Sequence, residues 1–255
     1  MHKLVKISFF SSIFLCIAAI LIVIGTYFFI RTELPEINLV DESELQMPLK
    51  VFTIDGELIG EFGEIKRRAT DYEDIPVNIK NAFLAAEDDN FFNHQGISYK
   101  GLIRSFIRCL SSDGCEGGGG TITMQVVRGY LLTRDQTVIR KIKEIYLALE
   151  LEGNISKEEI FELYVNRIFL GNRSYGIEAA ANTYFDKGLE DLTISESAAI
   201  AALAQLPSRV NPVKDPRRTI QRRNWILSRM LLLNNIDQIQ FDEAISQDLR
   251  VAKNI

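Results

Sequence analysis

The sequence predicts a mainly α-helical domain that opens with a short β-hairpin and follows one transmembrane helix. Three observations support this prediction. Residues 7–30 are uncharged, β-prone segments flank the pair Asp55-Gly56, and from Pro76 onward apolar residues recur at helical spacing. With 47% hydrophobic and 25% charged residues among 255, the composition is that of a folded chain, which excludes wholesale disorder.

The first element is the apolar segment at residues 7–30, which we interpret as an uncleaved transmembrane anchor. A helix of that length extends about 36 Å and can cross a bilayer core of about 30 Å. A cleaved signal peptide, the alternative, has a shorter apolar region that ends at a small-residue cleavage site. Lys3 and Lys6 precede the segment, so the positive-inside rule places residues 1–6 in the cytoplasm and the rest of the chain outside it.

A linker is expected at residues 31–48 and a single domain at residues 49–255. The domain begins with a β-hairpin over residues 49–63, because Asp55-Gly56 is a strong two-residue turn signal. We find no internal repeat in the rest of the domain, which therefore reads as one mainly helical unit.

Helical spacing and capping signals predict the remaining elements. The first helix follows Pro76, with Ile79, Phe83, Ala86 and Asn90 on one face. Further helices are expected over residues 138–152, from the capping box Ser156-x-x-Glu159 to Gly171, from the capping box Thr193-x-x-Glu196 to Pro207, and over residues 216–233 and 238–248.

Charge and rare residues narrow the possible functions. The net charge of -5 and the pI of about 5.3 argue against a general nucleic-acid binder, which needs a basic surface. Three Cys and two His match no familiar structural zinc site. Cys109 and Cys115 can close a small disulfide loop or remain free thiols, and the sequence leaves both readings open.

Two groups of charged residues are candidates for chemistry. Glu87 lies one helical turn after Phe83, on the apolar face, where desolvation raises the pKa of a carboxylate toward that of a general base. Asp88 is rotated toward a more polar side. Arg140 and Glu144 are i,i+4 partners that can form an anion clamp. The pattern alone also fits a solvated helix end for the first group and a salt-bridged helix face for the second.

Four motifs in a fixed order change this balance. They are EDxxFxxHxG at 87–96, GGGTITxQ at 118–125, RKxxE at 140–144 and ELYVNRIFLGNxxYGIEAAAxxYF at 162–185. LAQLPSRVNP at 203–212 and the pair Arg222-Arg223 follow them. This order resembles the peptidoglycan glycosyltransferase domain, the transglycosylase domain of bifunctional penicillin-binding proteins. The resemblance covers about residues 50–232. No SxxK, SxN or KTG set follows, so the expected class is a monofunctional peptidoglycan glycosyltransferase.

The resemblance implies a lysozyme-like, two-lobed α fold with a smaller apolar lobe that dips into the membrane. It implies polymerisation of lipid II into β-1,4-linked glycan strands by inverting transfer from a growing lipid-linked glycan. The expected location is the bacterial inner membrane, with one span and the catalytic domain outside the cytoplasm. Expected partners are lipid II, the lipid-linked glycan, membrane lipid and other cell-wall synthases, and no nucleic acid.

The resemblance also implies residue roles. Glu87 matches the catalytic base and Glu144 the second essential carboxylate, near the pyrophosphate. It allows a divalent cation, Mg or Mn, near Glu87 or Glu144, and no organic cofactor. Expected substrate-binding residues are Asp88, Phe91, His94, Gly96, Thr121, Thr123, Gln125, Arg140, Lys141 and Asn166. For His94, a packing and hydrogen-bonding role is expected before a metal-binding one.

Three positions depart from the family pattern. Gly120 replaces a Ser and Met124 a Gln, so a hydroxyl and an amide are lost, and restoring both is expected to strengthen binding. Arg173 stands where a Gly is common, so we expect an altered turn. Two rival functions therefore remain open. One is a non-catalytic lipid II-binding scaffold of the same family, and the other is a lysozyme-like lytic enzyme, which would need no basic clamp.

Overall fold

The computed structural model describes residues 69–101, 103, 120–132, 138–207 and 209–252, the strand residues 49–55 and 58–62, and the isolated residues Phe14, Gly25, Arg31 and Leu34. Apart from Phe14 and Gly25, the predicted anchor at residues 7–30 lies outside the described residues, as do Cys109 and Cys115. None of the described helices combines the length and the apolar character that a membrane crossing requires.

Two short strands precede the helices. Strand β1 (Leu49–Phe52) pairs antiparallel with β2 (Leu58–Phe62), with Leu49 opposite Phe62 and Phe52 opposite Leu58. The register shifts between Val51 and Phe52. The turn residue Gly56 of the predicted hairpin lies outside the described residues.

The rest of the described chain is helical, which confirms the mainly α prediction. The α-helices are α2 (Val77–Glu87), α4 (Ile122–Tyr130), α5 (Val138–Asn154), α6 (Lys157–Arg167), α7 (Ile177–Phe185), α8 (Ile194–Leu203), α9 (Pro216–Leu232) and α10 (Gln238–Ser246). Short 3-10 helices are η2 (Tyr72–Asp74), η3 (Phe91–Asn93) and η4 (Leu189–Asp191).

Local capping signals set several helix starts. Both predicted capping boxes are present, at Ser156 before α6 and at Thr193 before α8. Asp215 caps α9, and Pro216 occupies its first turn, where a missing N–H costs nothing. These signals are readable from sequence because both partners of each bond lie within one helical turn.

Two predicted helix ends are wrong. Helix α2 stops at Glu87, so Asn90 is not on its apolar face, because the backbone at Asp88 leaves the helix at φ -158° and ψ 81°. Helix α6 stops at Arg167, before the predicted end at Gly171. Helix α7 was not among the expected elements, and α4 was expected only in part, as an interfacial helix over residues 126–132.

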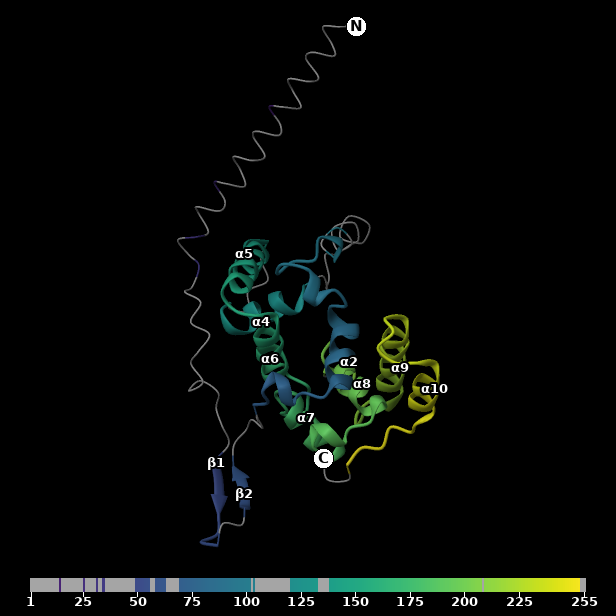
Figure 1. The fold of residues 1–255 in the computed structure, drawn as a ribbon. Coiled ribbons are helices and arrows are strands. Elements are labelled where there is room, and N and C mark those ends of the chain that lie inside the picture. The colour runs from purple at the N-terminus through teal and green to yellow at the C-terminus, as the bar shows by residue number, and fades with distance from the viewer. Residues whose placement is uncertain are drawn as a thin grey trace.

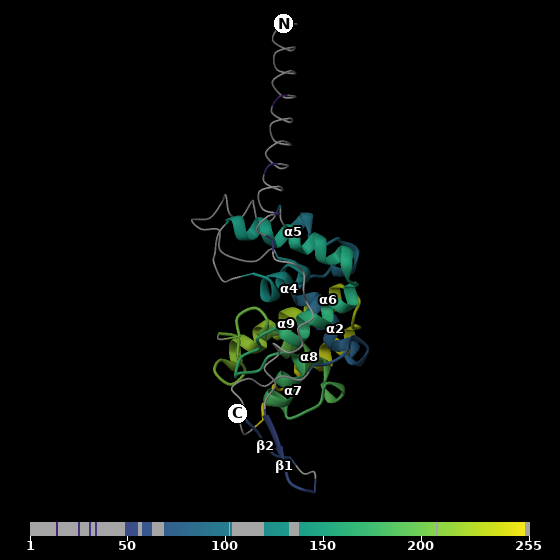
Figure 2. The same cartoon turned by 90° about the vertical axis from the view of Figure 1, so that its left-hand side faces the viewer.

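Helix α8 forms the centre of the core. From Ala198 to Leu203 its residues are at most 1% exposed, and their small side chains let α9 and α2 pack closely against it. On the other side of α2, helix α4 packs against α5 and α6. The edge-to-face contact of Phe83 with Tyr164, 6.0 Å between ring centroids, joins α2 to α6. In both views α5 lies at one end of the helical part and α7 at the other (Figure 1, Figure 2).

One buried arginine fastens α9 to its neighbours. Arg223 is 2% exposed and donates to Ser195 Oγ at 3.0 Å, to the Gln247 carbonyl at 2.8 Å and to the Ile245 carbonyl at 3.2 Å. A buried guanidinium is tolerated only when its donors are used. Arg223 therefore ties α8, α9 and the segment that ends α10 into one body.

The turn after Gly171 keeps a left-handed backbone despite Arg173. Asn172 and Arg173 have φ values of 44° and 62°, and Ser174 donates its N–H to the Gly171 carbonyl at 2.8 Å. Arg173 therefore adopts the positive φ that a Gly takes easily, and the expected alteration of the turn stays a prediction. The turn hydrogen bonds hold Arg173 in a conformation that non-glycine residues rarely adopt.

Candidate active site

Glu87 is the last residue of α2 and is partly buried. One carboxylate oxygen accepts a hydrogen bond from Gln125 Nε2 of α4 at 2.9 Å. Burial raises the pKa of Glu87, while the Gln125 bond and the positive charges of Arg222 and Arg128 lower it in part. The balance is a carboxylate with a raised pKa, which makes it a better proton acceptor than an exposed Glu.

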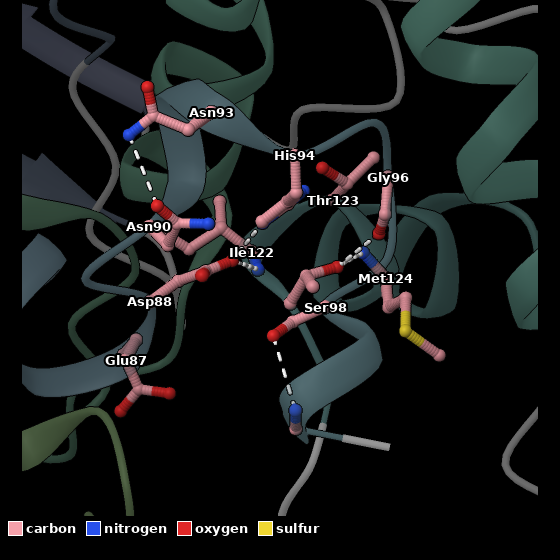
Figure 3. Close-up of polar contacts among 12 residues, drawn as sticks. Glu87, Asp88, Asn90, Asn93, His94, Gly96, Ser98, Ile122, Thr123 and Met124 are labelled. Atoms are coloured by element: carbon pink, nitrogen blue, oxygen red, sulfur yellow. Dashed lines mark hydrogen bonds and ion pairs between the residues drawn. The ribbon is translucent and has the colours of Figure 1, made fainter. Parts of the chain in front are cut away.

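Asp88 points away from Glu87 and has a different task (Figure 3). It is 8% exposed, and its Oδ2 accepts from His94 Nε2 at 2.9 Å and from the Ile122 amide at 3.2 Å. Asp88 is thus turned away from Glu87 toward polar groups, as expected, but these groups are buried, and one of them is an amide at the start of α4. Through this bond the end of α2, which carries Glu87, is fixed to the start of α4, which carries Gln125.

Further internal contacts fix the start of α4. Thr121 accepts from the Met124 amide at 3.1 Å and donates to the Gly96 carbonyl at 2.6 Å. Gly96 has φ +74°, and a Cβ there would lie 2.7 Å from the Ala148 carbonyl oxygen, so only glycine fits. Thr123 is fully buried and donates to Glu152 Oε1 at 2.5 Å. Helix α4 is thus held in one position relative to Glu87.

The second carboxylate, Glu144 of α5, is completely buried under cations. Lys141 Nζ lies 3.1 Å, Arg140 Nε 3.3 Å and Arg128 Nη1 4.0 Å from its oxygens. The three cationic side chains are 40%, 23% and 42% exposed, whereas the Glu144 side chain is 0% exposed. One buried negative charge thus organises three cations that retain access to solvent, an arrangement suited to binding an anion.

Helix α4 connects the two carboxylates. Gln125 contacts Glu87, and one turn later Arg128 reaches Glu144 while its charge also acts on Glu87. The Tyr164 hydroxyl is buried near this point without a hydrogen-bond partner among the described residues. Burial raises the pKa of Tyr164 well above its usual 10, so the phenol stays neutral. A base and a cationic cluster placed on one rigid frame can remove a proton at one end and stabilise a leaving anion at the other.

The comparison with protein families shows which family the chain belongs to. The family described as Transglycosylase matches residues 55–231, a range that contains both carboxylates. The chain belongs to the transglycosylase family. The relationship predicted from the four motifs is therefore confirmed.

The relatives of this transglycosylase are longer proteins. The chain is 44% identical over 253 residues to penicillin-binding protein 1A of Pseudomonas aeruginosa. The aligned region covers 99% of this chain and 31% of the relative. The chain is also 41% identical over 219 residues to penicillin-binding protein 1A of Escherichia coli, and that aligned region covers 86% of this chain and 26% of the relative. The chain thus spans less than a third of the length of either protein.

A solved structure is also similar to this transglycosylase. The crystal structure of penicillin-binding protein 1A from Haemophilus influenzae has 32% sequence identity and a TM-score of 0.49. The similarity covers 82% of this chain and 22% of that one.

Most of the predicted substrate-binding residues form internal contacts. Phe91 is 1% exposed and belongs to the core. Asn166 exchanges hydrogen bonds with the Thr70 backbone at 2.9 and 3.0 Å. The same holds for Asp88, His94, Gly96, Thr121 and Thr123, as described above. Their contact with substrate stays a prediction, whereas Gln125, Arg140 and Lys141 adjoin the two carboxylates directly.

The described donor sets do not fit a resident metal ion. No group of three His, Cys, Asp or Glu side chains converges anywhere in the part of the chain that the structure describes. Glu144 is enclosed by cations, and Asp88, the acid next to Glu87, spends its Oδ2 on His94 and Ile122. A divalent cation prefers several oxygen ligands without competing cations. The Mg or Mn ion near Glu87 or Glu144 stays a prediction.

Three site residues were missing from the sequence-based set. Arg128 lies one turn after Gln125 on α4, a spacing that could have identified it once α4 was recognised. Arg222 reaches Glu87 from α9, while its neighbour Arg223 turns into the core. Tyr164 lies in the family motif but was assigned no role. For Arg222 and Tyr164, only the tertiary fold brings the side chain to Glu87.

The departures at Gly120 and Met124 have opposite structural consequences. A Cβ at Gly120 would meet only Lys141 Nζ and Met124 Cβ, both at 3.8 Å, so a Ser hydroxyl fits beside the cationic cluster. Met124 is completely buried in the core, so a Gln there would place its amide in an apolar environment, and the expected gain in binding stays a prediction.

These positions should therefore respond differently to substitution. We expect Gly120→Ser to raise kcat/KM by about threefold to tenfold through an added hydrogen bond. We expect Met124→Gln to lower the free energy of unfolding by about 1–3 kcal/mol, because it buries an unpaired amide. Polymerisation kinetics and urea unfolding of the two single variants measure these effects. A Met124→Gln variant as stable as the parent would contradict the placement of this side chain in the core.

Proposed function

We propose that the protein is a peptidoglycan glycosyltransferase that polymerises lipid II into β-1,4-linked glycan strands at the outer face of the bacterial inner membrane. One observation carries the proposal. A partly buried base, Glu87, and a cationic cluster around Glu144 are joined by the single helix α4. Membership in the transglycosylase family and similarity to penicillin-binding proteins 1A support it.

The proposed reaction begins at Glu87. Its carboxylate takes the proton of the acceptor 4-hydroxyl, and the oxygen attacks the donor anomeric carbon from the face opposite the pyrophosphate. The bond between that carbon and the pyrophosphate oxygen breaks as the new glycosidic bond forms, so the configuration inverts. The raised pKa of Glu87 makes its carboxylate a stronger base for this step.

The cationic cluster acts on the leaving group. Arg128, Arg140 and Lys141 stabilise the negative charge that gathers on the lipid pyrophosphate as the bond breaks. Glu144 lies beneath them and holds their positions through the contacts at 3.1–4.0 Å. Because the three side chains are already oriented, little reorganisation is needed in the transition state.

The proposal is tested with labelled lipid II and the detergent-solubilised full chain. Ladders of glycan on a gel are expected. Shortening of a pre-made glycan strand would indicate a lytic enzyme, and binding without any product would indicate a scaffold. The intact pair of carboxylates favours the synthase, and attachment to the membrane through residues 7–30 and contact with other synthases form part of the same proposal.

The pH dependence of this reaction should respond to Gln125. Because its hydrogen bond lowers the pKa of Glu87, replacing it with Leu removes a stabilising contact to the ionised form. The base must be ionised, so we expect the acid limb of the kcat/KM profile to move to higher pH in Gln125→Leu. Gln95→Leu, at an exposed position, is the control and should keep the parent profile. A shift to lower pH would contradict the role of this hydrogen bond.

A further inference from the structure

An open depression of about 360 Å³ lies between the end of α8 and the face of α9. It is lined by Leu206, Arg209, Val210, Arg218, Arg222 and Trp225, together with two glutamines. Neither carboxylate of the candidate active site lines it. Figure 1 shows α8 and α9 beside α2, the helix that ends at Glu87.

The charge of this depression is one-sided. Three arginines line it, and no acidic side chain is among its described lining residues. Neither Arg209 nor Arg218 forms an ion pair with any residue in the described ranges. Two arginines without an ion-pair partner, gathered with a third in a concave surface, favour an anionic ligand.

One wall is held in place before any ligand binds. The Arg222 guanidinium carbon lies 4.0 Å from the centroid of the Trp225 ring, in a cation–π contact. Arg222 Nε is buried and has no hydrogen-bond partner among the described residues. Trp225 and Leu206 are 43% and 46% exposed and provide apolar contact area next to the three charges. A ligand that is anionic and also carries apolar groups fits this mixture.

Arg222 connects the depression to the catalytic base. Its positive charge acts on the Glu87 carboxylate, and Glu87 acts on Arg222 in return. Helix α9, which carries Arg218, Arg222 and Trp225 of the depression, also packs against α2, which ends at Glu87. A substituent on the acceptor sugar at Glu87 can extend into the depression.

We propose that this depression binds the carboxylates of the peptide attached to the acceptor sugar. The inference rests on the proposed function and extends it to the peptide part of the substrate. Any such peptide ends in a carboxylate, and its aliphatic side chains match Leu206, Val210 and Trp225. Guanidinium groups pair with carboxylates through two parallel hydrogen bonds, and three separate arginines suit charges spread along a flexible chain. Phosphate is a single compact anion. It suits the converging cations around Glu144 better than the separate arginines of the depression.

A binding experiment tests the proposal without catalysis. Trp225 is the only Trp of the chain, so its fluorescence reports directly on the depression. We expect saturable quenching when the full chain in detergent is titrated with a soluble disaccharide-peptide fragment of peptidoglycan. The double variant Arg209→Gln, Arg218→Gln should bind the fragment about tenfold more weakly, as measured by the concentration that gives half of the quenching. Arg217→Gln, on the same helix but outside the depression, is the matched control and should bind like the parent.

Two further titrations separate the possible ligands. The disaccharide without peptide and inorganic phosphate should leave the Trp225 fluorescence unchanged. Equal quenching by inorganic phosphate would indicate that the depression binds phosphate and not a peptide carboxylate, which would overturn the proposal. Absence of quenching by the disaccharide-peptide would also overturn it.

Kinetics distinguish this proposal from the proposed function. With peptide-bearing lipid II, the double variant should raise KM about tenfold at similar kcat, whereas with a peptide-free lipid-linked disaccharide the variant and the parent should be equal. Equal losses on both substrates would overturn the peptide site while leaving the glycosyltransferase intact. Failure of the parent to polymerise either substrate would contradict the proposed function, and the fluorescence titration would still decide the binding site.

Discussion

Replacing Glu87 with Gln is expected to reduce polymerisation of lipid II by about 10²- to 10⁴-fold. The amide keeps the shape of the side chain and can still accept the hydrogen bond of Gln125, but it cannot take a proton from the acceptor hydroxyl. Glu158→Gln, at an exposed position of α6, is the control and should retain parent activity. Initial rates on labelled lipid II measure the effect, and activity within threefold of the parent would remove Glu87 from the role of base.

The same variant should not lose stability at pH 7. The pKa of Glu87 is raised in the folded state, so the folded protein binds this proton more tightly than the unfolded chain does. Its ionisation therefore lowers the free energy of unfolding as pH rises through the folded pKa. Glu87→Gln removes that ionisation, and we expect an unfolding free energy at pH 7 equal to or above that of the parent. A clear loss of stability would indicate that Glu87 supports the fold.

Replacing Glu144 with Gln is expected to lower both activity and stability. The neutral amide leaves Arg128, Arg140 and Lys141 without their shared counter-charge. Because these cations keep access to solvent, we expect a loss of about 1–3 kcal/mol in the free energy of unfolding, below the cost of breaking a fully buried pair. Misplaced cations stabilise the pyrophosphate less well, so kcat should fall about tenfold or more.

Glu150→Gln is the matched control for this variant, since Glu150 lies on the same helix with an exposed side chain. It should match the parent in urea unfolding and in polymerisation rate. Glu87→Gln should keep or raise the free energy of unfolding and Glu144→Gln should lower it, so the comparison of these two variants is the sharper test. If Glu144→Gln were as stable as the parent, the cations would not depend on Glu144 for their positions.

Local sequence signals predicted the parts of the fold that are determined locally. The capping boxes at Ser156 and Thr193 join residues three positions apart, and both are present. The end of α2 was misplaced because its cause is distant in sequence. Asp88 leaves the helix and bonds to the Ile122 amide, 34 residues later. No periodicity within α2 contains that information.

The candidate site also combines residues that the sequence identified with residues that only the tertiary fold brings together. Helix position made Glu87 and the pair Arg140 and Glu144 candidates, but the resemblance of the four motifs assigned the roles of these residues and of Lys141. Arg222 could not be identified, because it reaches Glu87 only after α9 packs against α2 and α8. The apolar side chain of Met124 favoured a core or lipid-facing position over a ligand contact, and Met124 is buried.

The buried Arg223 has a consequence for the smallest segment that can fold. The family match ends at residue 231, within α9, yet two of the acceptors of Arg223 are the carbonyls of Ile245 and Gln247. A fragment cut at the end of the match would remove both of these carbonyl acceptors from a guanidinium inside the core and leave it the bond to Ser195. The autonomous folding unit therefore extends through α10, beyond the stretch that defines the family, and the edge of sequence similarity is not the edge of the cooperative structure.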